Sequence, residues 1–204
     1  MKRLLLIGLL LPTVALAQVK DPVLEGSPDN PTTLNEGPVS HSSVRGDFRV
    51  VFPPGCGKLV TKVPQEEAST EDDFPAVAVT LTFCDRYQEK GEGCSVSSFF
   101  NVLGKDGGAP GSEQVIERVV RFLKTMNATI NHETPISKEL PDGSIIEGID
   151  LLASDASGVG QAWVRGLLYQ GDIYVMAAWK NTGKLWDDPD FQNFFNSFQP
   201  GASD

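Results

Sequence analysis

Apolar and polar residues alternate in short runs over most of the chain after residue 46. In the run "DFRVVFP", at 47–53, the residues Phe48, Val50 and Phe52 fall on one face of an extended backbone, which predicts a strand. The stretch at 128–140 is expected to be extended but irregular. Further strands are expected at 58–63, 76–84, 94–102, 144–154, 161–169 and 173–180.

Two segments show helical spacing instead. In the first, Ser112 is a favourable N-cap, and an apolar stripe follows, formed by Val115, Val119, Phe122 and Met126 and flanked by Ile116, Val120 and Leu123. In the second, Asp188 is the expected N-cap and Pro189 the first helical residue. Its stripe consists of Phe191, Phe194, Phe195 and Phe198. Stripes this wide predict that each helix packs against a sheet.

The last pair of strands indicates how the layers are arranged. Gln170-Gly171-Asp172 predicts a tight hairpin, because glycine adopts the positive φ that such turns require. The strand at 173–180 is apolar on both faces, and such a strand is normally covered on both sides. We therefore expect an α+β fold: a single antiparallel β-sheet of about six to seven strands with helices packed on its faces, an α/β/α sandwich.

The two ends of the chain have a different composition. Residues 1–17 combine a basic head, a short apolar run and the small-x-small pattern Ala15-Leu16-Ala17, as in a signal peptide. The apolar run is much shorter than the ~20 residues that span a bilayer. We expect 18–46 to be a flexible Pro/Ser/Gly-rich tail, 47–199 a single domain and 200–204 a disordered C-terminus. The product would be periplasmic or extracellular.

Charge narrows the range of partners. The chain has a formal net charge of −10, and removal of Lys2 and Arg3 with the signal peptide lowers it to −12. Nucleic acids and anionic membrane surfaces attract basic patches, so neither is expected as a partner. No membrane insertion is expected after signal cleavage. The partner, whether a protein or a small molecule, is not identified by the sequence.

Three cysteines, Cys56, Cys84 and Cys94, form the one cluster with evident chemistry. If the first four strands run up and down, all three lie at the same end of the sheet. In an exported protein a nearby pair is usually a disulfide. Cys84–Cys94 is the favoured pair, and a bond from Cys56 to either of the others is the main alternative. A site with three thiolates for zinc or copper needs reduced cysteines and is less favoured.

Motifs for catalysis and cofactor binding are not recognised. The chain lacks the G-x-S-x-G pentapeptide of serine hydrolases, and its two histidines are His41 and His132. Among 27 acidic residues some pair is always available for hydrolysis, so acidity carries no signal. We name no catalytic residue, no metal ligand and no cofactor.

Both ends of the expected domain resemble the PsbP-like α/β/α sandwich superfamily. Its members often begin with an F-x-V-x-F-P strand and end with a hairpin carrying R-x-x-L and D-x-Y, followed by a phenylalanine-rich helix. The matching positions are Phe48, Val50, Phe52, Pro53, Arg165, Leu168, Asp172, Tyr174, Phe191, Phe195 and Phe198, with Phe191 shifted by one from the usual spacing. The resemblance implies a binding, assembly or accessory role with no common active site.

The expected function is therefore that of an exported, non-catalytic binding or envelope accessory module. The alternatives are a carboxylate-dependent hydrolase of unfamiliar type and a cysteine-based metal carrier. Tyr169 and Trp186 form an interaction face if both are exposed beside one another.

Overall fold

The computed structural model describes residues 37–43, 47–56, 59–62, 78–84, 91–100, 108–125, 127–181 and 183–201. The expected signal peptide at 1–17 and most of the expected tail lie outside these residues.

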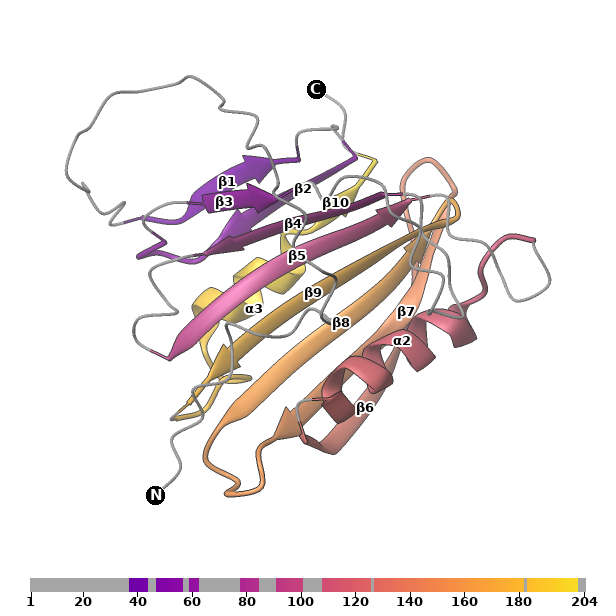
Figure 1. The fold of residues 1–204 in the computed structure, drawn as a ribbon. Helices are drawn as coiled ribbons and strands as arrows, with labels where there is room; N and C mark the ends of the chain where they lie inside the picture. The colour runs from indigo at the N-terminus through magenta and orange to yellow at the C-terminus, as the bar shows by residue number, and fades with distance from the viewer. Residues whose placement is uncertain are drawn as a thin grey trace, which may run out of the picture.

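A seven-stranded antiparallel sheet forms the centre of the molecule (Figure 1). Its spatial order is β3-β4-β5-β9-β8-β7-β6. The strands are β3 (Leu59–Lys62), β4 (Ala78–Cys84), β5 (Glu92–Phe100), β6 (Thr129–Glu139), β7 (Ile145–Ser154), β8 (Gln161–Tyr169) and β9 (Asp172–Lys180). The segment expected to be irregular is thus a full edge strand, β6, with one shift of register between Ile130 and His132.

A second sheet of three strands was not expected. It consists of β1 (Val39–Ser42), β2 (Phe48–Phe52) and β10 (Gln199–Pro200), with β2 in the middle. The α+β class is confirmed, but the prediction of a single sheet is wrong. The strand β1 lies within the residues expected to form the tail, and β10 includes Pro200, the first residue of the expected C-terminal segment. Both strands owe their order to pairing with β2.

The three-stranded sheet and helix α3 (Pro189–Asn196) cover one face of the large sheet. Alternation in β2 buries Phe48, Val50 and Phe52 completely against this face. Ring contacts connect the layers: Phe48 lies 6.2 Å from Tyr174 of β9, and Phe52 lies 5.3 Å from Phe194 of α3. This face is therefore rich in aromatic side chains.

Helix α2 (Ser112–Thr125) covers the opposite face, over β6, β7 and β8 (Figure 1). Val115, Val119 and Leu123 of the expected stripe are completely buried. The helix approaches β8 closely at Gly166, where an added Cβ would lie 2.5 Å from Cγ2 of Val119 and 2.8 Å from Cγ1 of Val115. Met126 lies outside the described residues. The N-cap differs from the expectation: Ser112 is already helical, and the N–H of Gly111 donates to Oε1 of Gln114 at 2.9 Å.

The hairpin between β8 and β9 has the expected turn. Gln170 has a φ of 50° and Gly171 a φ of 87°, so both central residues are left-handed, as a type I′ turn requires. The strand β9 that follows is buried on both faces, since Tyr174 and Met176 belong to the aromatic-rich side and Ala177 packs with the α2 side. The prediction that this strand is covered on both sides is confirmed.

Candidate functional site

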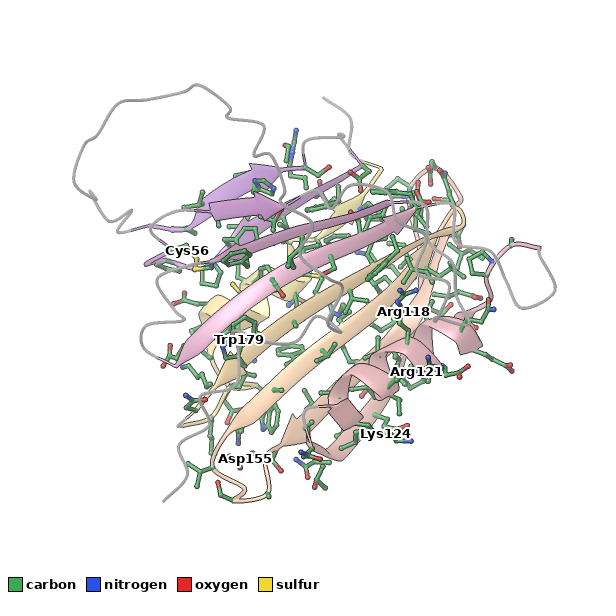
Figure 2. The ribbon with its side chains drawn as sticks, in the orientation of Figure 1. Cys56, Arg118, Arg121, Lys124, Asp155 and Trp179 are labelled. Carbon is green, nitrogen blue, oxygen red and sulfur yellow. A yellow bond between two sulfur atoms is a disulfide. The ribbon has the colours of Figure 1, made fainter. Side chains whose placement is uncertain are left out.

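The three cysteines meet at one end of the large sheet, between the two sheets. Cys56 follows the end of β2, Cys84 is the last residue of β4, and Cys94 lies near the start of β5. All three side chains are completely buried, and their sulfur atoms lie within 4.8 Å of one another. Figure 2 shows the sulfur atoms beside Cys56. The expectation that the three cysteines share one end of the sheet is confirmed, although β2 belongs to the small sheet.

The disulfide is Cys56–Cys84, with 5.2 Å between the two Cα atoms, and Cys94 is the free thiol. The favoured prediction, Cys84–Cys94, thus differs from the structure. The physical reason is the small sheet, which docks over β4 and β5 and brings the chain after β2 to Cys84. The bond joins the two sheets across the core, instead of closing the loop between two neighbouring strands.

The free thiol lies in an apolar environment. Cys94 is paired with Ala178 of β9 in the strand register, and it belongs to the same buried cluster as Val96 and Met176. Burial raises the pKa of the Cys94 thiol well above its ordinary value, because desolvation disfavours the thiolate. Thiolates and not thiols act as nucleophiles and metal ligands, so this thiol is inert toward solvent in the folded protein.

The same three sulfur atoms could hold a soft metal ion only if the disulfide were reduced. Three thiolates would then surround the ion, which is the donor set that zinc and copper(I) accept. With Zn²⁺ the complex would carry one net negative charge, and with Cu⁺ two, inside a cluster made of apolar side chains. Burying an uncompensated charge is costly, whereas a disulfide with a protonated thiol is neutral. The apolar environment therefore favours a neutral disulfide with a protonated thiol over a charged metal–thiolate complex.

A network of polar side chains fixes α3 on the large sheet. Arg165 of β8 donates to both carboxylate oxygens of Asp150 at 2.8 and 2.7 Å, and to the carbonyl oxygen of Phe195 at 2.8 Å. The Nε1–H of Trp163 donates to the same carboxylate at 3.0 Å. Arg165 thus anchors the C-terminal end of α3, where the helix dipole favours a cation. We did not anticipate the role of Asp150, although its place opposite Arg165 in the β7–β8 register is the signal that would have found it.

The N-terminal end of α3 is anchored in the same way. Asp188 is the N-cap, as expected, and its Oδ1 accepts the N–H of Asp190 at 3.0 Å. Its Oδ2 accepts a charged hydrogen bond from Lys180 of β9 at 2.5 Å. The half-buried ion pairs at the two ends of α3 thus position the helix.

The two histidines occupy different environments. His41 of β1 lies between the sheets, with Nε2 3.4 Å from Oγ1 of Thr82 and its ring 5.8 Å from that of Phe52. Burial lowers the pKa of His41 from its ordinary value. His132 is exposed in the edge strand β6. His41 belongs to the small sheet and His132 to the edge strand β6 of the large sheet. The structure therefore does not bring the two rings into one site.

The expected interaction face is not assembled. Tyr169 is only 7% exposed and packs near Gly201, whose added Cβ would lie 3.0 Å from the Tyr169 ring. Trp186 is half-buried in the segment between β9 and α3. Tyr169 precedes β9 and Trp186 follows it, so the nine residues of the strand separate them. The condition that both be exposed side by side is not met.

Comparison with known proteins adds little. No family model and no curated protein matches the chain. Among solved structures it is similar to a protein of unknown function, PA94 from Pseudomonas aeruginosa, with a TM-score of 0.29 and 10% identity over 71% of this chain and 83% of that one. A similarity of this size supports no assignment of fold or function. Neither helix in the described part of the chain is long and apolar enough to cross a membrane. The resemblance to the PsbP-like superfamily stays a prediction.

Proposed function

We propose that this chain is an exported, non-catalytic accessory module, of the PsbP-like α/β/α type, that works in the periplasm or outside the cell. The observation that carries the proposal is the Cys56–Cys84 disulfide between the two sheets. Structural disulfides form and persist in oxidising compartments and are rare in the cytosol. The signal-peptide pattern at 1–17 points to the same destination.

The half-buried polar groups around α3 support a non-catalytic role. Asp150 is bound to Arg165 and Trp163, and Asp188 is bound to Lys180, so these carboxylates hold α3 and the sheet together. A pair of catalytic carboxylates needs unoccupied oxygens that face a substrate from both sides. The carboxylate oxygens of Asp150 and Asp188 instead accept hydrogen bonds from residues of the same fold. This weakens the hydrolase alternative.

The metal-carrier alternative is favoured by one observation, the mutual distance of the three sulfur atoms. Complete burial of all three argues against it, since a carrier must load and release its ion. The disulfide also occupies two of the three ligands. We therefore rank it below the accessory role.

The proposal is tested first at the level of export. The full chain with a C-terminal tag is expressed in a bacterial host beside a Leu5→Arg, Leu9→Arg variant, whose apolar run is broken. We expect the mature wild-type protein to begin at Gln18, to lie outside the cytosol and to contain one thiol that reacts after denaturation. The variant should stay in the cytosol. A wild-type product that keeps Met1 and has three reactive thiols would contradict the proposal.

The accessory role is tested by recovery of partners. Wild-type protein is purified from the exported fraction of its source organism after mild cross-linking, beside a Phe194→Ala, Phe195→Ala variant with a damaged core. A partner recovered in constant ratio with wild type, and lost with the variant, supports the role. Recovery of a free monomer at native abundance, together with turnover of a panel of ester and glycoside substrates, would favour the enzymatic alternative.

A further inference from the structure

Cys84 has two sulfur neighbours: one is Cys56, to which it is bonded, and the other is Cys94 on the neighbouring strand. Phe83 of β4 is paired with Ser95 of β5, so the next position along this antiparallel pair places Cys84 opposite Cys94. Both side chains point to the face that carries the small sheet, since all three cysteines belong to one buried cluster. Cys84 is thus bonded to Cys56 and stands directly across the strands from the thiol of Cys94.

Both neighbours of Cys84 lie at disulfide range. Opposed residues in an antiparallel pair have Cα atoms about 4.5–5.5 Å apart. Disulfides accept Cα separations of about 4.4–6.8 Å. The existing bond spans 5.2 Å, and all three sulfur atoms lie within 4.8 Å of one another. Cys84 can therefore bond to Cys94 without a change in the pairing of β4 with β5.

We infer that the cysteine cluster is a thiol–disulfide exchange site that alternates between the bonds Cys56–Cys84 and Cys84–Cys94. In the exchange, the Cys94 thiol loses its proton and its sulfur attacks Sγ of Cys84. The Cys84–Cys94 bond forms as the Cys56–Cys84 bond breaks. The electron pair leaves on Sγ of Cys56, which takes up the proton. The number of thiols and disulfides is unchanged, so the step needs no external oxidant or reductant.

The two bonds have different mechanical consequences. Cys56–Cys84 ties the end of β2, and with it the small sheet, to the large sheet across 28 residues of sequence. Cys84–Cys94 closes only the connection between the neighbouring strands β4 and β5. Exchange from Cys56–Cys84 to Cys84–Cys94 breaks the covalent bond between the two sheets, while the domain still contains one disulfide. The cluster thus controls how firmly the small sheet is held over β4 and β5.

Burial keeps the exchange slow and protects it from other reactions. The folded protein holds little Cys94 thiolate, and the three sulfur atoms are closed to solvent. Local opening of the chain after β2 raises the thiolate fraction and speeds the exchange. A partner that pulls on the small sheet would therefore trigger it.

Peptide mapping of the free thiol tests the inference. Oxidised wild-type protein is incubated in urea below its unfolding midpoint, quenched in acid, and alkylated after complete denaturation. We expect the label to lie on Cys94 at the start and to move partly to Cys56 with time, while the thiol count stays at one. The Cys94→Ala variant, which has no attacking thiol, should show no label at any time.

A second variant makes the outcome independent of the exchange rate. Exported Cys56→Ala should contain a Cys84–Cys94 disulfide and no free thiol, and near-ultraviolet circular dichroism checks that it is folded. A wild-type label that stays on Cys94, or that appears on Cys84, would overturn the inference. So would a folded Cys56→Ala protein with two free thiols, or stoichiometric zinc or copper in native mass spectra of the wild type.

Discussion

The two faces of the large sheet are covered in different ways. One face is covered by a single helix, α2, which packs aliphatic side chains against β6, β7 and β8. The other is covered by segments from both ends of the domain, β1 and β2 before residue 53 and α3 and β10 after residue 188. On the first face, Arg118 of α2 also lies over the ring of Phe99, 4.0 Å from its centroid. The second adds a disulfide and two charged anchors, Arg165 and Lys180.

The difference follows from chain connectivity. Helix α2 precedes the strands β6, β7 and β8 that it contacts, so these contacts close shorter loops than those of the other face and cost less conformational entropy. The aromatic-rich face joins residues more than 140 positions apart, as in the 2.9 Å hydrogen bond from the N–H of Val51 to Oγ of Ser197. Contacts between such distant residues cost more to order. Covalent and ionic anchors on that face offset part of this cost.

Loss of an aromatic side chain at the centre of the second face should have the largest effect. Phe194 is completely buried and contacts the rings of Phe52 and Phe195. We expect Phe194→Ala to lower the free energy of unfolding by about 3–5 kcal/mol in urea denaturation. Leu123→Ala on α2 is the matched control. Hydrogen exchange should accelerate in β2 for the first variant and not for the second; equal acceleration in both would remove the distinction between the faces.

Removal of the disulfide should have a slightly smaller effect. The bonded residues are 28 positions apart, for which the chain-entropy model gives about 3–4 kcal/mol. We expect the Cys56→Ala, Cys84→Ala variant to lose this amount in urea denaturation, and wild type to lose a similar amount when reduced. If wild type unfolds at the same urea concentration with and without a reductant, the bond does not hold the second face.

Overpacking should disturb the α2 face by a smaller amount. The Cβ of Gly166→Ala would lie 2.5 Å from Cγ2 of Val119, closer than two carbon atoms pack. We expect a loss of about 1–3 kcal/mol, measured by thermal or urea unfolding. Val119→Ala in the same chain should recover part of it, because it removes the opposing methyl groups. Strictly additive losses in this double-mutant cycle would show that the helix does not rest on Gly166.

Acidification from pH 7 to pH 5 should produce the smallest effect, through His41 on the second face. Burial lowers the pKa of His41 below its ordinary value of 6.5, so the unfolded chain binds a proton more readily than the folded one. Its contribution to stability is therefore complete above pH 6.5 and decreases as pH falls toward the folded pKa. We expect the free energy of unfolding, measured by urea denaturation, to fall less between pH 7 and pH 5 in the His41→Gln variant than in wild type. An unchanged fall in the His41→Gln variant would contradict this expectation.

The features that are predictable from sequence are those that local pattern determines. The two helices, the N-cap Asp188 with Pro189, and the turn at Gln170-Gly171 all follow from neighbouring residues, and the structure contains each of them. The meeting of Cys84 and Cys94 was also predictable, because the antiparallel pairing of β4 with β5 brings the end of one strand to the start of the other.

The small sheet could not be predicted in the same way. The strand β1 has the polar sequence Val-Ser-His-Ser, and β10 has two residues, so neither carries an alternating pattern of its own. Their order depends on β2, which pairs with both. The disulfide partner of Cys84 depends on where this sheet docks. The separation of Tyr169 from Trp186, by contrast, follows from the nine residues of β9 that lie between them.

The position of β2 between β1 and β10 has a consequence for the order of events in biosynthesis. Its partner on one side, β1, is synthesised before β2 itself. Its partner on the other side consists of Gln199 and Pro200. Next to them, the N–H of Gly201 donates to the carbonyl oxygen of Asp47 at 2.7 Å. Residues 199–201 are the last part of the domain to leave the ribosome. The small sheet therefore stays incomplete until residues 199–201 have been synthesised, although β1 and β2 are in place much earlier.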